Sequence, residues 1–181
     1  MSRIGRMPIA IPAGVKVDVD GCQVAVKGPK GTLSLAIHKD MRIREEDGKL
    51  HIERPSDSKL HKALHGLTRS LVQNMVTGVS VGFEKALDIQ GVGFKAAKNG
   101  KTLTLTIGLS HTVEMVDPDG IVVEVPAPNK IVVKGCDKQL VGETAAKIRA
   151  KRVPDAYQGK GIKYADEVLK LKEGKTGGKA K

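Results

Sequence analysis

The chain has 181 residues, with 31 lysines and arginines against 20 aspartates and glutamates, so its formal net charge is +11. Such an excess favours a polyanionic partner, with nucleic acid ahead of an acidic membrane surface. No apolar run approaches the roughly 20 residues that span a bilayer, and the basic first residues lack the apolar core of a secretory signal. We therefore predict a cytoplasmic protein without membrane contact, built from one large or two small domains.

The first half of the chain predicts antiparallel strands. Apolar and polar residues alternate over short runs separated by glycine-containing turns, which is typical of half-buried antiparallel strands. The predicted strands begin with the alternating Val15, Val17 and Val19 and continue with Gln23 to Lys27, Thr32 to Ile37, Met41 to Glu45 and Lys49 to Glu53.

A helix is predicted next, from about Ser58 to Thr77. Asp57 or Ser56 is a suitable N-cap, and Gly78 is a suitable stop. Apolar residues recur in this segment at spacings of three and four, so they share one face of the helix. The predicted buried stripe consists of Leu60, Leu64, Leu67, Leu71 and Met75.

The second half repeats this order of elements. A helix from Asp137 to about Arg152 stops before Pro154, because the residue ahead of a proline avoids the helical conformation. Its predicted buried residues are Leu140, Val141, Thr144 and Ile148. The predicted strands ahead of it are Ala86 to Gln90, Gly93 to Lys98, Thr102 to Ile107, Val113 to Val116, Ile121 to Val125 and Lys130 to Val133.

The shared order of elements predicts two copies of one plan. Aligning Asp57 with Asp137 also matches Leu60 with Leu140, so duplication with a period of about 80 residues is a hypothesis. The predicted fold class is α+β, with two similar tandem domains that each pack a mainly antiparallel β-sheet against one α-helix. We assign residues 1–81 to the N-terminal domain, 82–169 to the C-terminal domain and 170–181 to a basic tail that we expect to be disordered on its own.

The most positive region surrounds the end of the second helix. From Lys134 to Lys181 there are 13 basic and 6 acidic residues, a net charge of +7. The segment Val153 to Glu167 interleaves lysines with glycines, so cations are presented by a backbone that can come close to its partner. Phosphate groups are bound by cations and by a closely approaching backbone, so we predict an RNA-binding surface here. The predicted RNA-binding residues are Lys147, Arg149, Lys151, Arg152, Tyr157, Gln158, Gly159, Lys160, Gly161, Lys163 and Tyr164.

The residue types in this region favour folded RNA. We expect Gly159 and Gly161 to permit a tight loop outside the core, with backbone amides that face phosphate. The whole chain has two tyrosines, two phenylalanines and no tryptophan. Readers of single-stranded RNA stack bases on aromatic side chains, which are scarce here. A structural protein that grips the backbone and shape of double-helical RNA is the better prediction.

The chain predicts no metal site. Cys22 and Cys136 lie far apart in the sequence and outside any C-x-x-C pattern, so we expect two small buried or half-buried thiols. His61 and His65 are spaced like a two-histidine metal face, but no third ligand accompanies them. We expect both histidines at the surface or facing RNA.

Catalytic motifs are also absent from the sequence. Gly91 and Gly93 resemble a fragment of a dinucleotide-binding fingerprint, but no βαβ unit follows, so a bulge or bend within a strand is expected. His111 has no nucleophile or acid arranged around it, and no pair of carboxylates stands out. We predict that the protein is not an enzyme and has no cofactor and no small-molecule substrate.

Several blocks spread over nearly the whole chain carry a family resemblance. They are SRIGRMPIAIPAGV at the start, GPKGTL from Gly28, ERPSDSKLHKALHGLTRSL from Glu53, GVGFKA from Gly91, GCDKQLVGETAAKIRAKR from Gly135 and VPDAYQGKGIKYADE from Val153. In this order they resemble the bacterial members of the large-subunit ribosomal protein six family. Gln158 departs from the basic residue usual in that family, which weakens its assignment as a phosphate contact. Thr112 replaces a more common proline, which affects only a turn.

The resemblance implies contact with large-subunit ribosomal RNA, mainly through the second domain. It also implies a position near the stalk base and the region on which translation factors act, beside neighbouring large-subunit ribosomal proteins of the stalk base. Two other hypotheses remain. An enzyme that acts on RNA is disfavoured because no catalytic constellation is evident, and a protein-interaction adaptor would have an unusual charge of +11.

Overall fold

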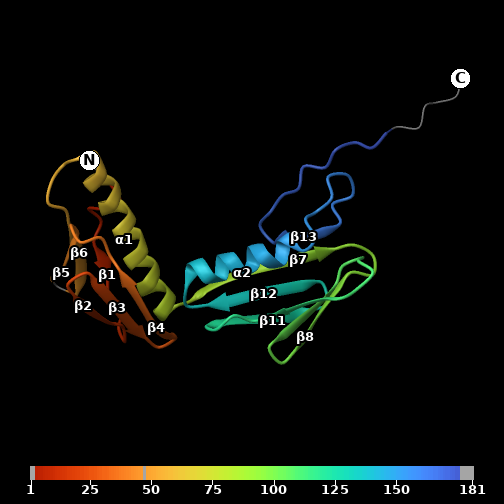
Figure 1. Ribbon diagram of the computed structural model, residues 1–181, viewed down its shortest axis with the longest axis horizontal. Coiled ribbons are helices and arrows are strands. Elements are labelled where there is room, and N and C mark those ends of the chain that lie inside the picture. The colour runs from red at the N-terminus through yellow and green to blue at the C-terminus, as the bar shows by residue number, and fades with distance from the viewer. Residues whose placement is uncertain (1–2, 47, 176–181) are drawn as a thin grey trace, which may run out of the picture. The chain divides into compact units, whose positions relative to one another are not determined.

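The computed structural model describes residues 3–46 and 48–175 (Figure 1). The chain divides into two compact units: the first extends to Phe83 and includes Gly135–Lys138, and the second contains Glu84–Lys134 and the chain from Gln139 onward. Each unit combines antiparallel strands with one helix, which confirms the predicted fold class. The part of the predicted tail beyond residue 175 lies outside the described residues.

The first unit is built from two three-stranded antiparallel sheets and helix α1. One sheet has the order β1-β6-β5 and the other β2-β3-β4, and α1 packs against β3, β4 and β6. Its core is formed by aliphatic residues of both sheets and the helix, such as Val24, Val26, Leu50 and Val72. The elements are β1 (Ile9–Ala10), β2 (Lys16–Asp20), β3 (Gln23–Gly28), β4 (Gly31–Ala36), β5 (Arg42–Glu46), β6 (Lys49–Glu53) and α1 (Lys59–Ser80).

Helix α1 buries a different face from the predicted one. Leu60 and Leu67 are 61% and 55% exposed, Leu64 and Leu71 are half-buried, and of the predicted stripe only Met75 is buried. The predicted stripe is therefore rotated about the helix axis by about one residue from the face that is buried. The face that packs on the sheets consists of His65, Thr68, Val72, Met75, Val76 and Val79.

The N-cap of α1 is Ser58, one or two positions beyond the predicted Asp57 or Ser56. The Ser58 hydroxyl accepts a hydrogen bond from the backbone N–H of His61 at 3.1 Å. Asp57 instead accepts from the Arg54 guanidinium, at 2.6 Å from NH2 and 3.1 Å from Nε. The hydroxyl of Ser56 lies 2.7 Å from Nδ1 of His61. Both alternative caps are thus occupied by side-chain partners, which leaves Ser58 to satisfy a free amide of the first turn.

Gly78 does not end α1 as predicted, because the helix continues to Ser80 with Val81 as its C-cap. A Cβ at Gly78 would lie 2.0 Å from the carbonyl oxygen of Cys136, which belongs to the same unit. Glycine here permits close packing of a backbone segment on the helix. The turn away from the helix is made instead by Gly82, whose φ is 81°.

The second unit contains a four-stranded sheet of order β11-β12-β7-β13 and a three-stranded sheet of order β10-β9-β8. Helix α2 buries Val141, Thr144, Ala145 and Ile148, whereas the predicted Leu140 is 38% exposed. The elements are β7 (Phe83–Gln90), β8 (Lys95–Asn99), β9 (Thr102–Thr106), β10 (Val113–Val116), β11 (Ile121–Ala127), β12 (Lys130–Gly135), α2 (Lys138–Ala150) and β13 (Gly161–Tyr164).

Two glycines predicted to interrupt a strand lie between two strands. Strand β7 ends at Gln90 and β8 begins at Lys95, so Gly91 and Gly93 form the connection, and the expected bulge or bend within a strand was wrong. Their φ values are 144° and 76°. A Cβ at Gly91 would lie 2.7 Å from a ring carbon of Phe94, so the connection folds over that ring.

Candidate nucleic-acid interface

The predicted RNA-binding segment is held at both ends by the second unit's sheet and helix. Helix α2 ends at Ala150, and the chain returns as β13, which pairs antiparallel with β7 from Gly161 opposite Gln90 to Tyr164 opposite Leu87. The backbone N–H of Ile162 donates to the carbonyl of Arg152 at 2.8 Å, and Ile162 is fully buried. The second half of the segment, Gly161–Tyr164, is therefore part of the sheet, and the expectation of a loop outside the core was wrong for Gly161.

The role of Gly161 differs from the predicted one. Gly161 is buried, and a Cβ there would lie 2.7 Å from Cα of Pro154 and 2.8 Å from the carbonyl oxygen of Arg152. Its φ is 147°, which side-chain-bearing residues rarely adopt. Glycine is thus required by close packing within the protein, whatever else the segment contacts.

A compact loop, residues 155–160, precedes β13, and we call it the Asp155 loop (Figure 1). The Asp155 carboxylate accepts from the backbone N–H of Gln158 at 2.8 Å and of Tyr157 at 3.1 Å. These bonds, led by that from Gln158, hold the pKa of the Asp155 carboxyl below its ordinary value. The amide of Gly159 donates to the Asp155 carbonyl at 3.0 Å, so it does not face phosphate as predicted.

Three cations border this loop, and no side-chain hydrogen bond or close ion pair is seen for them among the described residues, although Lys160 attracts the Asp155 carboxylate. Lys151 and Arg152 follow α2, and Lys160 ends the Asp155 loop; all three are exposed. Tyr157, 58% exposed, and Gln158, also exposed, project from the same loop. These five predicted residues are brought together as an open polar and cationic surface, which we call the loop surface.

Three other predicted residues form an internal cluster. The Arg149 guanidinium donates to both carboxylate oxygens of Glu167, at 2.9 Å and 2.6 Å, and lies over the Tyr164 ring at 5.5 Å from its centroid. On the same ring, Lys85 lies 5.6 Å from the centroid. Lys163 donates to the Glu167 backbone carbonyl at 3.3 Å. Arg149, Lys163 and Tyr164 therefore stabilise the turn after β13 and are less available to a ligand.

The electrostatics of this cluster are mutual. The hydrogen bonds with Glu167 raise the pKa of Arg149, and the Arg149 bonds lower the pKa of Glu167. Both side chains are about one quarter exposed, so solvent only partly screens the pair. Lys147 is also paired, with Glu143 at 2.7 Å, although both of these side chains are largely exposed. Such an exposed pair is weak, so Lys147 can exchange it for another anion.

The first residues of the predicted tail lie against the Asp155 loop, a contact that the sequence did not predict. The backbone N–H of Lys172 donates to the carbonyl of Ala156 at 2.8 Å. A Cβ at Gly159 would lie 3.4 Å from a methyl carbon of Leu169 and of Leu171, so both leucines cover that glycine. The spacing of the two leucines, which alternates with lysines, was the available signal.

Of the two histidines considered as a metal face, His65 is structural, contrary to the expectation of a surface or RNA-facing side chain. His65 is buried, and its Nε2 lies 2.8 Å from the Ile52 carbonyl oxygen while its Nδ1 lies 2.8 Å from NH1 of Arg54. His61 is half-buried, with its Nε2 3.3 Å from Oδ2 of Asp40. Within residues 3–46 and 48–175, no group of three or more His, Cys, Asp or Glu side chains could hold a metal ion.

The two cysteines are free thiols. Cys136 is half-buried, as predicted, and its sulfur donates to the carbonyl of Lys30 at 2.9 Å. Cys22 is exposed, so the expectation of a buried or half-buried thiol was wrong for that residue.

Among the described helices, none is long and apolar enough to cross a bilayer.

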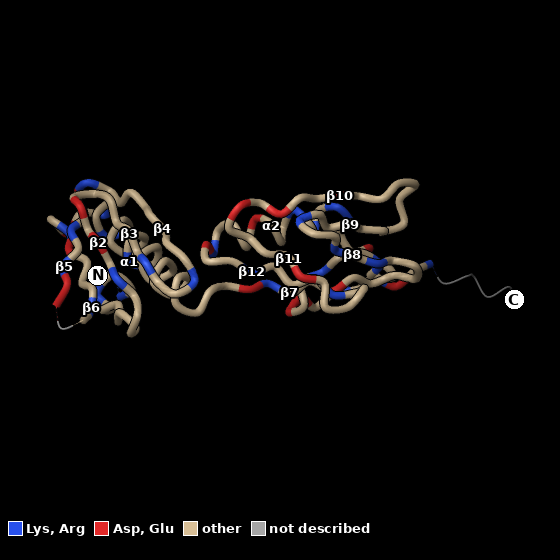
Figure 2. Tube along the Cα trace, turned by 90° about the horizontal axis from the view of Figure 1, so that it is seen from below, with Lys and Arg blue, Asp and Glu red and all other residues tan. Residues whose placement is uncertain are grey.

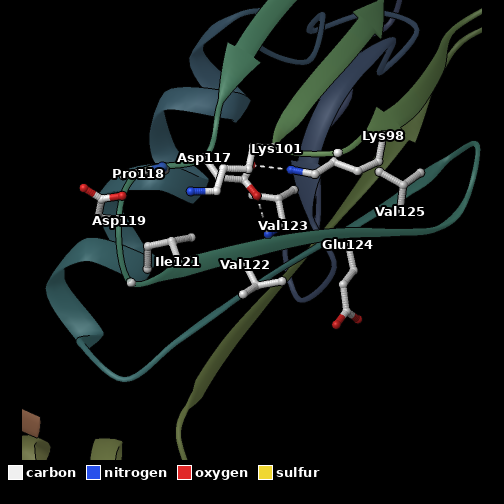
Figure 3. Close-up of a pocket in the computed structure, with 12 residues that line it drawn as sticks. Lys98, Lys101, Asp117, Pro118, Asp119, Ile121, Val122, Val123, Glu124 and Val125 are labelled. Atoms are coloured by element: carbon white, nitrogen blue, oxygen red, sulfur yellow. Dashed lines mark hydrogen bonds and ion pairs between the residues drawn. The ribbon is translucent and has the colours of Figure 1, made fainter. Parts of the chain in front are cut away.

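A hollow of about 480 Å³ opens in the second unit, away from the loop surface in sequence (Figure 3). Lys98 and Asp117 pair across it, and the other Asp117 oxygen accepts from the backbone N–H of Val123 at 3.3 Å. These polar groups satisfy one another and link β8 to β11. The residues that line the hollow form no arrangement of nucleophile, acid and base.

The features described so far define a class of protein. Basic and acidic residues are interspersed along each unit (Figure 2), but a formal charge of +11 remains, and unpaired cations border a loop held at both ends. A basic α+β protein with two tandem units and such a loop belongs with the nucleic-acid-binding proteins.

Comparisons with known proteins name the family. The family model described as Ribosomal protein L6 matches residues 11–82 and 90–165, one match in each half. The chain belongs to this ribosomal protein family, which confirms the resemblance found in the sequence. Proteins named "Large ribosomal subunit protein uL6" are 61% identical in Ruminiclostridium cellulolyticum and 59% in Carboxydothermus hydrogenoformans, with 100% of both chains covered. The protein of that name in Clostridioides difficile is 57% identical, over 99% of this chain and 100% of its own.

Proposed function

We propose that the protein is a structural constituent of the large ribosomal subunit in the cytoplasm, where it binds and stabilises large-subunit (23S-type) ribosomal RNA. Support comes from relatives named as large-subunit proteins that match the chain over its whole length. The finer parts of the proposal are a location near the stalk base and factor-binding region, and contact with neighbouring large-subunit proteins of the stalk base. In this role the protein has no reaction to catalyse and needs no cofactor.

The observation that carries the RNA-binding proposal is the loop surface. Lys151, Arg152 and Lys160 are exposed and form no close ion pair among the described residues, so a phosphate competes only with the attraction of Lys160 to the Asp155 carboxylate. Neutralising phosphates releases condensed counterions, which supplies most of the free energy of such binding. Tyr157 and Gln158 can add hydrogen bonds to phosphate or ribose from the same loop.

The remaining predicted residues divide by their internal partners. Lys147 extends the surface along α2, since its pair with Glu143 is exposed. Arg149, Lys163 and Tyr164 make hydrogen bonds with Glu167 and so stabilise the turn that follows β13. Gly159 and Gly161 contribute through the close packing of the loop. The proposed phosphate contacts are therefore Lys147, Lys151, Arg152 and Lys160, with Tyr157 and Gln158 as neutral contacts.

Salt dependence of binding tests this mechanism. With about 4 cationic phosphate contacts, the slope of log affinity against log salt concentration is expected to be about −2.8 to −3.6. The measurement is a filter-binding titration of purified large-subunit RNA with the full chain at several salt concentrations. A slope near zero would contradict an electrostatic interface.

A single-residue variant tests the location of the surface. Lys160→Ala is expected to lower affinity several-fold and to make the salt slope shallower by about one contact. Lys101→Ala is the matched control, because Lys101 is an exposed lysine in the β8–β9 turn and loses the same charge. Equal effects of the two substitutions would mean that only net charge matters and that the loop surface is not the site.

Association with the particle distinguishes this proposal from the two other hypotheses. A tagged full-length protein is expected to cosediment with large subunits at one copy per particle. An adaptor or an RNA-acting enzyme would be recovered mostly in other fractions. Recovery away from large subunits would contradict the proposed function.

A further inference from the structure

Asp155 is an acidic residue in the middle of the loop surface, and its charge is unfavourable for binding a polyanion. The side chain is exposed, so phosphates near the loop would meet it. At physiological ionic strength, charges within about 8 Å still repel each other appreciably. A surface selected for positive charge alone would not place a carboxylate here.

The contacts of Asp155 give it a different role. Its carboxylate holds the amides of Tyr157 and Gln158 at 3.1 and 2.8 Å. Its carbonyl accepts from Gly159 at 3.0 Å, and its own amide donates to the carbonyl of Lys160 at 2.9 Å. One residue therefore makes a bond to each of the last four residues of the loop.

The loop is also held from outside. The Lys172 amide bonds the Ala156 carbonyl at 2.8 Å, and Leu169 and Leu171 cover Gly159. A loop fixed in this way loses little conformational entropy on binding, whereas a mobile loop must be ordered at the expense of affinity. The benefit of a fixed loop can exceed the cost of one solvent-screened negative charge.

We propose that Asp155 is a positioning residue for RNA binding: although it is negatively charged, it strengthens binding by fixing Tyr157, Gln158 and Lys160 in the orientation that contacts RNA. The inference rests on the proposed function and deepens it. Asp155 itself makes no contact with phosphate in this role. Its contribution passes mainly through the backbone of the loop, and its attraction to the Lys160 side chain adds to it.

The test compares two substitutions that remove the same charge. Asp155→Ala raises the net charge from +11 to +12, so charge alone predicts tighter binding to large-subunit RNA. Loss of positioning predicts binding that is weaker by about tenfold. Asp155→Asn keeps a side-chain oxygen that accepts from the loop amides, so it is expected to bind at least as tightly as the wild type.

Glu173→Gln is the matched charge control, because Glu173 is exposed and has no side-chain partner among the described residues. It is expected to tighten binding slightly, by less than about twofold. Thermal unfolding of Asp155→Ala should stay close to wild type, since the bonds lie at the surface. The proposal is overturned if Asp155→Ala binds as tightly as wild type or as Glu173→Gln, or if Asp155→Asn binds as weakly as Asp155→Ala.

A second variant decides the matter if Asp155→Ala fails to fold. Gly159→Ala keeps every charge but strains the loop, because Gly159 has a φ of 69°. Weaker binding by this variant supports positioning, and unchanged binding overturns it. Failure of the proposed function itself would look different: the wild-type protein would show no salt-dependent affinity for the RNA.

Discussion

The two helices occupy corresponding places in the two units, but they end in different ways. Helix α1 has no basic residue in its last turn, and its C-cap carbonyl, that of Val81, accepts instead from Lys30 of the β3–β4 turn. Helix α2 carries Lys147 and Arg149 in its own last turn. Cations are favourable near a helix C-terminus in both cases. The same arrangement of elements can thus place a cation at a helix C-terminus in two ways. In α1 the lysine comes from a distant turn, and in α2 the cations belong to the helix itself and continue into the loop surface.

The two helices also differ in how much space surrounds a glycine. A Cβ at Gly78 of α1 would lie 2.0 Å from the Cys136 carbonyl oxygen, whereas a Cβ at Gly142 of α2 would meet nothing within 4 Å. Gly78, near the end of α1, is thus packed by protein, whereas Gly142, near the start of α2, is open. Four predictions test this contrast and the anchoring of the segment that follows α2.

The largest effect is expected from Gly161→Val. The new side chain would clash with the backbone of Pro154 and Arg152 and would force valine to a φ of 147°. We expect a loss of unfolding free energy of about 2–5 kcal/mol, measured by urea denaturation. The control is Gly174→Val, because a Cβ at Gly174 meets nothing within 4 Å. Normal stability with weakened RNA binding would mean that Gly161 serves approach to RNA after all.

A smaller loss is expected from Gly78→Ala. Alanine favours the helical state by about 1 kcal/mol, but the clash with the Cys136 carbonyl outweighs this gain. The net loss should be about 1–3 kcal/mol, measured by thermal unfolding.

The matched substitution Gly142→Ala should have the opposite sign. Nothing obstructs its Cβ, so only the helix propensity remains and we expect a gain of about 0.5–1 kcal/mol. If both substitutions change stability in the same direction, the contrast between the two helices fails.

An effect about as small as that of Gly142→Ala is expected from Glu167→Gln, which removes the carboxylate that holds Arg149 beside the end of α2. We expect a loss of about 1 kcal/mol at pH 7. Because the folded pKa of Glu167 lies below its ordinary value of 4.5, its contribution is complete above that value and is lost as the pH falls through the folded pKa.

Wild-type and Glu167→Gln stabilities should therefore converge in acid, which urea denaturation at pH 7 and pH 3 would measure. Lys30→Met is the comparison at the end of α1. No carboxylate takes part in that contact, so its small effect should be the same at both pH values. A gap between wild type and Glu167→Gln that does not narrow between pH 7 and pH 3 would contradict the assignment.

Sequence patterns predicted the fold class and most strands because alternation and glycine turns are local signals. The buried face of α1 was missed because the regular spacing of the leucines indicated one face, whereas the face that is buried contains two polar residues. His65 and Thr68 occupy the buried face, and His65 does so because Ile52 and Arg54 satisfy its ring nitrogens. Such partners come from distant segments, and no periodicity within the helix reveals them.

The candidate site stays a prediction, and the structure adds a division of roles among its residues. The density of lysines drew attention to the segment that contains the loop surface. Strand β13 was missed because four residues that begin with glycine give little strand signal. The pairing of Arg149 with Glu167 depends on the return of the chain along β7, which the sequence alone did not predict.

The pairing of β13 with β7 also determines when the interface can form during synthesis. Strand β7 pairs with β12 and with β13, and β13 is synthesised last. The four-stranded sheet therefore stays incomplete until Gly161 to Tyr164 have been synthesised, when most of the chain already exists. A nascent chain that stops at the end of α2 would carry the first unit and the helix but no Asp155 loop. Premature termination there would thus yield fragments that lack the loop surface.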